Sequence, residues 1–214
     1  MSIYEKTLTL KNTTTLRYTL SIPGSYSGEQ PVPLVTALHY GGTVTPWYGK
    51  GYLTILVEPA LRELGAVIAA PDCPGNGWDN LSSESAILSM VDHIKQHYNI
   101  NSEQVLITGF SMGAIGAWYM AARYPHIFSA AIPISGIANR ETLEIIKDIP
   151  IYAIHSKQDE IFSIKPVQEM VREVKKKGVP VHLEVVEGIS HYNTGLFAGP
   201  LRAAVPWIKK IWEK

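Results

Sequence analysis

The sequence predicts an α/β fold, namely a doubly wound, mostly parallel sheet of about eight strands with an antiparallel N-terminal edge and no cap domain. Three observations support this prediction. Short and almost entirely apolar runs recur from residue 34 onward, segments with helical periodicity separate them, and the first 22 residues instead alternate apolar and polar side chains. Continuous apolar runs of this length are typical of strands that are buried on both faces of a sheet.

The alternating N-terminal segment consists of residues 3–10 and 16–22, which flank a polar Lys-Asn-Thr stretch. Alternation with a period of two indicates strands with one face in water, and the polar residues between them indicate a turn. We therefore expect an antiparallel hairpin at the edge of the sheet. This segment has neither a basic start nor a continuous apolar stretch, so it does not predict a signal peptide.

The remaining elements follow from the change between apolar runs and helical periodicity. Strands are expected at residues 34–38, 66–70, 105–108, 130–134, 151–154 and 181–186. Helices are expected at residues 52–64, 82–98, 112–124, 166–177 and 201–212. Because strands and helices alternate without a linker or an internal repeat, we expect a single domain over residues 1–214.

The composition argues against several classes of partner. The 214 residues include 19 basic and 19 acidic side chains, so there is no excess charge to attract nucleic acid. No apolar run approaches the roughly 20 residues that span a bilayer, which predicts no membrane partner and leaves the location as cytoplasmic or unknown. The single cysteine, Cys73, excludes an internal disulfide and a multi-cysteine metal site. The composition does not fix the oligomeric state.

A candidate nucleophile follows the strand expected at residues 105–108. Residues 109–113 read Gly-Phe-Ser-Met-Gly, and a helix is expected directly afterwards. A strand that turns at once into a helix makes a tight bend, and glycines two positions either side of the serine let the backbones approach there. We predict that Ser111 is presented above the sheet at the helix N-terminus, where negative charge is favoured. The alternative is a serine that only caps the helix.

A serine hydroxyl needs an adjacent base, and the base needs an orienting acid. Asp159 and His191 lie in the loops after the last two expected strands. Because active sites of open α/β sheets lie beyond the carboxyl ends of the strands, we predict Asp159 as the acid and His191 as the base. Glu160 is the neighbouring alternative for the acid. Two other histidines, His39 and His155, also end strands, but structural roles suit them better.

Acyl transfer also requires two donors that stabilise an oxyanion. We predict the backbone N–H groups of Met112 and of Gly41, the latter in the His-Tyr-Gly-Gly loop after residues 34–38. Four aromatic residues on strand-end loops are predicted to line a substrate pocket, because rings bind apolar groups by shape. These are Tyr40, Trp47, Trp78 and Tyr192. Their alternative role is to anchor the loops.

Taken together, these motifs resemble small α/β-hydrolase esterases of the carboxylesterase and phospholipase type, in particular predicted peptidases and feruloyl-esterase-like or polyhydroxybutyrate-depolymerase-like enzymes. The resemblance covers nearly the whole chain and is strongest at residues 109–136, where Ala-Arg-Tyr-Pro and Ala-Ile-Pro-Ile-Ser-Gly follow the serine motif. It implies a serine esterase that forms an acyl-enzyme and uses no cofactor and no metal. In this chain Tyr40 replaces the first glycine of the family's His-Gly-x-Gly loop, and Ser190 replaces the glycine before the base. If the first of these positions requires a positive φ, the loop must be rearranged.

The expected substrate is a small-molecule carboxylic ester with a short acyl chain, since the chain leaves little room for an inserted cap. A feruloyl or acetyl polysaccharide esterase, a thioesterase and a small peptidase are alternatives on the same triad, because the fold does not choose among them. The alternative from another class is a hydrolase-fold protein that binds a ligand without turning it over.

Overall fold

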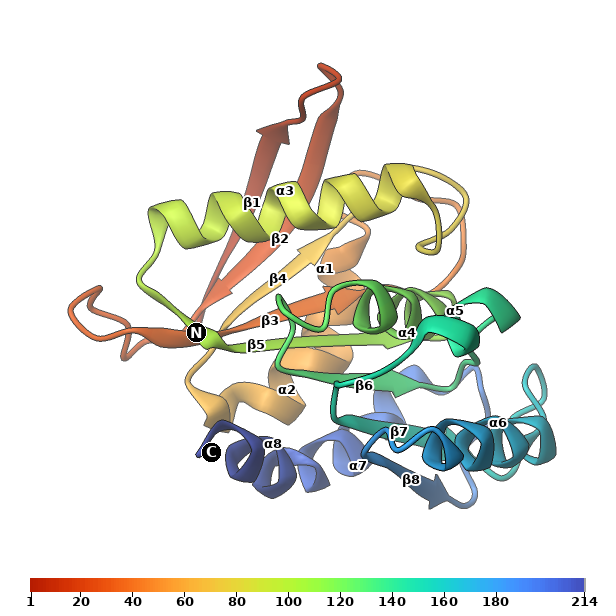
Figure 1. The fold of residues 1–214 in the computed structure, drawn as a ribbon. Helices are drawn as coiled ribbons and strands as arrows, with labels where there is room; N and C mark the ends of the chain where they lie inside the picture. Colours follow the sequence, from red (N-terminus) through yellow and green to blue (C-terminus); the bar gives the residue numbers. More distant parts are fainter. Residues whose placement is uncertain (214) are drawn as a thin grey trace.

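A computed structural model describes residues 1–213 and is built around one eight-stranded sheet (Figure 1). The strand order is β1-β2-β4-β3-β5-β6-β7-β8; β1 pairs with β2 and β2 with β4 in antiparallel fashion, and all other pairs are parallel. This confirms the predicted fold class. The strands are β1 (Ser2–Thr9), β2 (Thr15–Ile22), β3 (Val32–Leu38), β4 (Val67–Pro71), β5 (Ile100–Phe110), β6 (Ala130–Ile134), β7 (Ile151–Ser156) and β8 (Val181–Val186).

Helices cover both faces of the sheet (Figure 1). On one face lie α3 (Leu81–His97), α4 (Met112–Arg123), α6 (Ile164–Lys176) and, beside α4, α5 (Arg140–Ile145). On the other face lie α1 (Gly49–Tyr52), the π-helical turn η1 (Leu53–Val57), α2 (Glu58–Leu61), the 3₁₀ turns η2 (Arg62–Leu64) and η3 (Thr194–Phe197), α7 (Ala198–Ala203) and α8 (Val205–Trp212).

The buried strands contribute alternate side chains to two separate cores. In β3, Leu34 and Leu38 enter the core that contains Trp118 of α4, whereas Val35 enters the core that contains Leu56 of η1. Successive side chains of a strand point to opposite faces, so a strand covered on both sides must be apolar at every position. The continuous apolar runs in the sequence have this origin.

Two helical segments differ from their expected form. Residues 52–64 do not form one α-helix, because a π-helical turn and a 3₁₀ turn interrupt the α-helical path from α1 through η2. The C-terminal helix is divided at Ala204 into α7 and α8, and a proline occupies the first turn of α8. Proline lacks a backbone N–H and is accommodated at a helix start, which explains the division.

The parallel strands place their carboxyl ends at one edge of the sheet (Figure 1). Leu38 at the end of β3 is level with Gly109 near the end of β5, and Ser156 at the end of β7 is level with Val186 at the end of β8. The loops that follow these strands therefore start side by side. The β1–β2 hairpin lies at the lateral border of the sheet, on the side away from β8, and projects beyond the helical layers (Figure 1).

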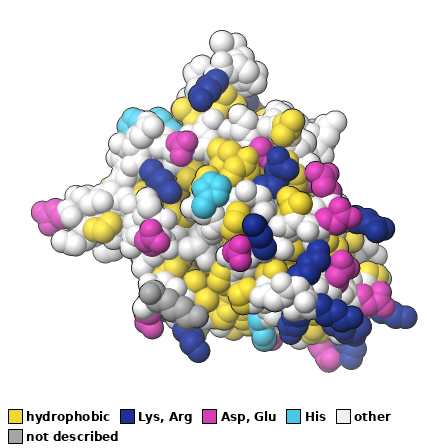
Figure 2. Space-filling view, in the orientation of Figure 1, with side chains coloured by type: hydrophobic (Ala, Val, Ile, Leu, Met, Phe, Trp, Pro, Cys, Tyr) yellow, Lys and Arg dark blue, Asp and Glu magenta, His cyan; other side chains and the backbone are white. Residues whose placement is uncertain are grey.

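The surface carries intermingled charges. Figure 2 shows basic and acidic side chains next to one another over the part of the molecule where α6 lies. Within residues 1–213, no helix combines the length and the apolar character needed to cross a membrane. The same residues contain no group of three or more His, Cys, Asp or Glu side chains placed to hold a metal ion.

Candidate active site

Ser111 occupies the sharp turn between β5 and α4. Its φ of 55° lies in the left-handed region, which non-glycine residues rarely adopt. The backbone N–H of Ser111 donates to the carbonyl of Ile134 at the end of β6 (2.9 Å), and the carbonyl of Ser111 accepts from Ala114 in the first turn of α4 (2.9 Å). A strained serine held by bonds on both sides is typical of a functional position.

The two glycines of the serine motif are required by close backbone contacts. A Cβ on Gly109 would collide with the carbonyl group of Gly113. A Cβ on Gly113 would collide with the carbonyl group of Leu38 at the end of β3. Only glycine at both positions allows β5, α4 and β3 to approach as closely as they do.

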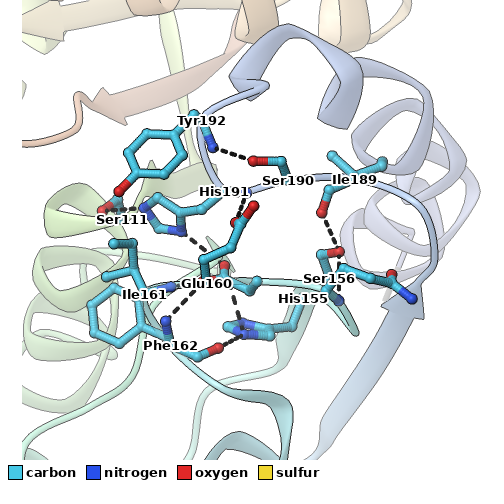
Figure 3. Close-up of polar contacts among 12 residues, drawn as sticks. Ser111, His155, Ser156, Glu160, Ile161, Phe162, Ile189, Ser190, His191 and Tyr192 are labelled. Atoms are coloured by element: carbon cyan, nitrogen blue, oxygen red, sulfur yellow. Dashed lines mark hydrogen bonds and ion pairs between the residues drawn. The ribbon is translucent and has the colours of Figure 1, made fainter.

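The structure brings the three predicted catalytic residues into one hydrogen-bonded chain. His191 Nδ1 lies 2.8 Å from Asp159 Oδ2, and His191 Nε2 lies 2.9 Å from Ser111 Oγ (Figure 3). An ionised carboxylate can only accept, so Nδ1–H donates to Asp159, and Nε2 is left to accept the hydroxyl proton of Ser111. This tautomer is the one that a general base for Ser111 requires.

Asp159 is fixed by its own loop. Its Oδ1 accepts hydrogen bonds from the backbone N–H groups of Ile161 (3.0 Å) and Phe162 (2.7 Å). These bonds leave Oδ2 to face the ring of His191. Because one oxygen is anchored to the backbone, the carboxylate holds the imidazole in a single orientation.

Glu160 contacts the same histidine at a different atom. Its Oε2 accepts from the backbone N–H of His191 at 2.8 Å, and Figure 3 shows Glu160 beside the backbone of the loop rather than at the ring. Hydrogen bonds from the Ser190 side chain and then from this N–H lower the pKa of Glu160 below its ordinary value. The geometry therefore favours Asp159 over Glu160 as the partner of the ring.

His155 lies beneath the acid loop and is almost fully buried. Its Nε2 donates to the carbonyl of Phe162 at 2.7 Å (Figure 3). Burial lowers the pKa of His155, and this effect outweighs the opposing influence of the Phe162 carbonyl and of Asp159. A neutral His155 thus ties Phe162 to β7 and supports the backbone that holds Asp159.

His39 orients the loop that carries the second predicted oxyanion donor. Its Nδ1 lies 2.6 Å from the carbonyl oxygen of Tyr40, and its Nε2 accepts from the backbone N–H of Cys73 at 3.0 Å. Burial lowers the pKa of His39 and so favours the neutral ring. In a trans peptide the C=O and the following N–H point in opposite directions. Since His39 holds the Tyr40 carbonyl, the N–H of Gly41 faces away from the buried ring.

Gly41 and Met112 lie next to each other. A Cβ on Gly41 would be 3.8 Å from Met112 Cβ, and Gly41 lines the same cleft as Ser111. Met112 is the first residue of α4, where backbone N–H groups have no intrahelical acceptor. In this loop the left-handed φ belongs to Gly42 (149°), whereas Tyr40 is not among the positive-φ residues of the described chain. A side chain at position 40 therefore needs no rearrangement.

A cleft of about 830 Å³ opens over Ser111 and His191. Of the four aromatic residues predicted to line it, Tyr40 and Tyr192 do so. The sequence did not indicate four further apolar residues of its wall, which come from the π-helical turn, from the end of β5, from the loop after β7 and from η3. These are Ile55, Phe110, Ile161 and Leu196. Ile161 and Leu196 could have been sought near Asp159 and His191, whereas nothing in the sequence marks Ile55.

The predicted roles of Trp47 and Trp78 in the pocket are corrected by the structure. Trp78 is fully buried in the core, where its Nε1 donates to the carbonyl of His39 at 2.9 Å. The Trp47 backbone N–H donates to Asp72 Oδ2 at 2.7 Å, and the Arg17 guanidinium lies 5.9 Å from the Trp47 ring. Neither tryptophan lines the cleft. A position on a strand-end loop does not determine which way the ring turns.

Comparisons with solved structures and with known sequences place this architecture in the α/β-hydrolase superfamily. The structure of a thermostable esterase superposes with a TM-score of 0.83 at 24% identity, over 97% of this chain and 62% of that chain. A ferulic acid esterase superposes with a TM-score of 0.78 at 19% identity, over 98% of both chains. At these identities the likeness shows the fold.

The chain belongs to the dienelactone hydrolase family. The model of that family matches residues 64–194, a stretch of more than half the chain that includes Ser111, Asp159 and His191. Protein usf of Aquifex pyrophilus is 30% identical over 103 residues, which cover 47% of this chain and 44% of that protein. Acetylxylan esterase A of Talaromyces purpureogenus is 34% identical over 118 residues, which cover 49% of this chain and 30% of that protein. The chain thus matches less than half the length of these relatives.

Proposed function

We propose that this protein is a carboxylic ester hydrolase that acts through an acyl-enzyme on Ser111. The observation that carries the proposal is the continuous chain of hydrogen bonds from Asp159 through His191 to Ser111 Oγ. A serine hydroxyl is a weak nucleophile unless a correctly oriented base can take its proton, and this chain supplies both conditions.

In the proposed reaction, His191 Nε2 takes the hydroxyl proton as Ser111 Oγ attacks the ester carbonyl carbon. The carbonyl oxygen becomes an oxyanion that the N–H groups of Met112 and Gly41 stabilise. When the tetrahedral intermediate collapses, the C–O bond to the alcohol breaks and His191 gives its proton to the leaving oxygen. A water molecule then repeats the sequence on the acyl-enzyme, which releases the acid. Asp159 remains ionised and stabilises the protonated ring of His191 throughout.

The proposed substrate is a small-molecule ester with a short acyl group of about two to six carbons. Tyr192 and Leu196 at the opening of the cleft are 72% and 58% exposed, so a chain lying across them stays partly in water. A methylene contributes its roughly 0.8 kcal/mol only when it is removed from water. The acetylxylan esterases among the relatives are named for an acetyl group, which agrees with a short acyl chain.

A polysaccharide acetyl or feruloyl esterase is the second candidate. The open cleft favours it, because a large alcohol part can extend beyond the exposed rim at Tyr192 and Leu196 without meeting an enclosing wall. Acetylated xylan and methyl ferulate, assayed beside simple esters, distinguish this candidate from a general small esterase.

The test of the proposed function compares Ser111→Ala with Ser102→Ala, a control at the opposite and exposed end of the same strand. We expect Ser111→Ala to lose turnover of p-nitrophenyl acetate by several orders of magnitude and to lose labelling by a fluorophosphonate, with both retained in the control. Retained turnover in Ser111→Ala, or an unlabelled parent protein without turnover, would contradict the proposal, and the second result would indicate a binding protein. Rates on acetate, butyrate, octanoate and palmitate esters then test the short acyl preference.

A further inference from the structure

The walls of the cleft differ from the rest of the surface in charge. Among the described residues, those that line the cleft include no lysine, arginine, aspartate or glutamate, and His191 is the one histidine among them. The polar groups on the walls are hydroxyls and an amide, from Tyr40, Tyr192, Thr194 and Asn193. A ligand in this cleft is therefore met by apolar side chains and neutral dipoles.

Four large apolar side chains form a collar around the opening. They are Ile55, Ile161, Tyr192 and Leu196, which are 45%, 50%, 72% and 58% exposed. They come from η1, from the loop after β7 and from the segment after β8, yet they meet at one opening. Ten large apolar side chains of the described chain are exposed, and four of these ten line this one cleft. Apolar side chains scattered singly are ordinary, but their concentration over a nucleophile points to a binding role.

Two carboxylates, those of Asp159 and Glu160, lie behind the collar at His191. Asp159 accepts a hydrogen bond from the ring of His191, and Glu160 accepts one from the backbone N–H of His191. Glu160 directly precedes Ile161 of the collar. A carboxylate on a bound substrate would lose hydration against the apolar walls, find no cation there, and lie near two like charges. An uncharged substrate meets none of these costs.

From this arrangement we infer that the cleft selects uncharged esters, whose apolar part lies against the collar, and discriminates against esters that carry a carboxylate on the acyl or the alcohol part. The inference rests on the proposed ester hydrolysis at Ser111. It restricts the class of substrate beyond what the triad determines, because the triad acts on any ester carbonyl that reaches Ser111.

The test uses two matched pairs of esters. Methyl 4-acetoxybenzoate and 4-acetoxybenzoate differ by a charge on the alcohol part, and p-nitrophenyl hexanoate and mono-p-nitrophenyl adipate differ by a charge on the acyl part. Each rate is divided by the hydroxide-catalysed rate of the same ester, which removes differences in intrinsic reactivity. We expect the carboxylate to lower kcat/KM at least tenfold in at least one pair and to raise it in neither.

Substitutions in the collar test whether the discrimination against anionic esters arises from these side chains. Ile161→Lys and Leu196→Lys place a cation at the opening, and because both side chains are at least half exposed, neither change buries a charge. We expect both variants to reduce the discrimination severalfold. The matched control is Ile3→Lys on β1, which is 41% exposed and lies at the sheet edge furthest from β8. This control leaves the ratio between the paired esters unchanged.

The outcomes separate the inference from the proposed function. If the parent protein cleaves none of the four esters, the proposed function fails. If the neutral and the anionic esters are cleaved with equal corrected kcat/KM in both pairs, ester hydrolysis stands and the charge selection is wrong. If Ile3→Lys narrows the ratio as much as Leu196→Lys does, the selection arises from the overall charge and not from the collar, which also overturns the inference.

Discussion

The carboxylate of Glu160 accepts a hydrogen bond from the backbone N–H of His191 at 2.8 Å, while the neighbouring Asp159 accepts one from the ring of the same residue. Two successive carboxylates thus hold one histidine, the first at its imidazole and the second at its backbone. The base is fixed from two directions by a single loop. The two contacts have different consequences when they are removed.

We expect Asp159→Asn to lower kcat far more than Glu160→Gln. Replacing the acid of a serine triad by asparagine costs about 10⁴ in kcat, because the histidine is then held in the wrong tautomer. Glu160→Gln keeps an acceptor for the backbone N–H, so we expect a loss of about tenfold or less. Steady-state rates of the two variants on p-nitrophenyl acetate show which of the two carboxylates acts as the acid of the triad. If Glu160→Gln is the harsher change, Glu160 and not Asp159 is the acid.

A second prediction concerns His39, which holds the Tyr40 carbonyl. His39→Ala frees the peptide group that carries the Gly41 N–H, and the loss of one oxyanion donor lowers kcat about 10² to 10³-fold. We expect KM to change much less than kcat. Cys73→Ala is the matched control, since it removes a buried side chain nearby but keeps the backbone N–H that His39 accepts. Equal losses of kcat in the two variants would assign His39 a purely structural role.

Trp78 and Tyr192 are expected to respond in opposite ways. Trp78 is fully buried, so Trp78→Ala should lower the free energy of unfolding by about 3–5 kcal/mol while relative rates across an ester panel stay the same. Tyr192 is 72% exposed and lines the cleft, so Tyr192→Ala should change relative rates with little effect on unfolding. Denaturant unfolding and one panel of esters measure both effects. A changed ester preference in Trp78→Ala, with an unaltered free energy of unfolding, would show that Trp78 does contribute to the substrate pocket.

The fourth prediction concerns the pH dependence of stability. Glu84 accepts hydrogen bonds from Tyr119 (2.8 Å), Arg123 (2.7 Å) and Tyr124 (2.6 Å). Burial by itself raises the pKa of Glu84, but the bonds from the two tyrosines and the arginine outweigh it, and the pKa is lowered. A depressed folded-state pKa stabilises the protein above the unfolded value near 4.5, and this contribution disappears as the pH falls through the folded-state pKa.

Glu84→Gln should therefore lower the free energy of unfolding at pH 7 and flatten its decline below about pH 5. Glu103→Gln, at an exposed position of β5, is the control and should leave both properties unchanged. Denaturant unfolding at pH 7, 5 and 4 measures them. A Glu84→Gln variant that loses stability on acidification as steeply as the parent protein would show that Glu84 has no part in this pH dependence.

The sequence predicted those features that follow from a local pattern or from the topology of a parallel sheet, and it did not predict those that depend on how side chains pack. The strands β6 and β8 have the predicted bounds. β6 is an apolar run that is buried at every position, whereas β8 is followed directly by the bend at Glu187 and Gly188. The meeting of Ser111 with His191 was predictable, since parallel strands end at one edge. The π-helical turn that carries Ile55 and the buried ring of Trp78 were not, because both depend on tertiary packing that no local pattern records.

His191 follows β8, which pairs only with β7 and forms one border of the sheet, whereas Ser111 follows the central strand β5. Border strands open at a lower free energy than central ones, because they have hydrogen-bonded neighbours on one side only. On warming, β8 is therefore expected to fray while the turn between β5 and α4 that carries Ser111 is still folded, and the hydrogen bond between His191 and Ser111 is then lost. Hydrolysis should cease at a lower temperature than the cooperative melting of the core, so that the loss of catalytic activity reports the opening of the β8 border.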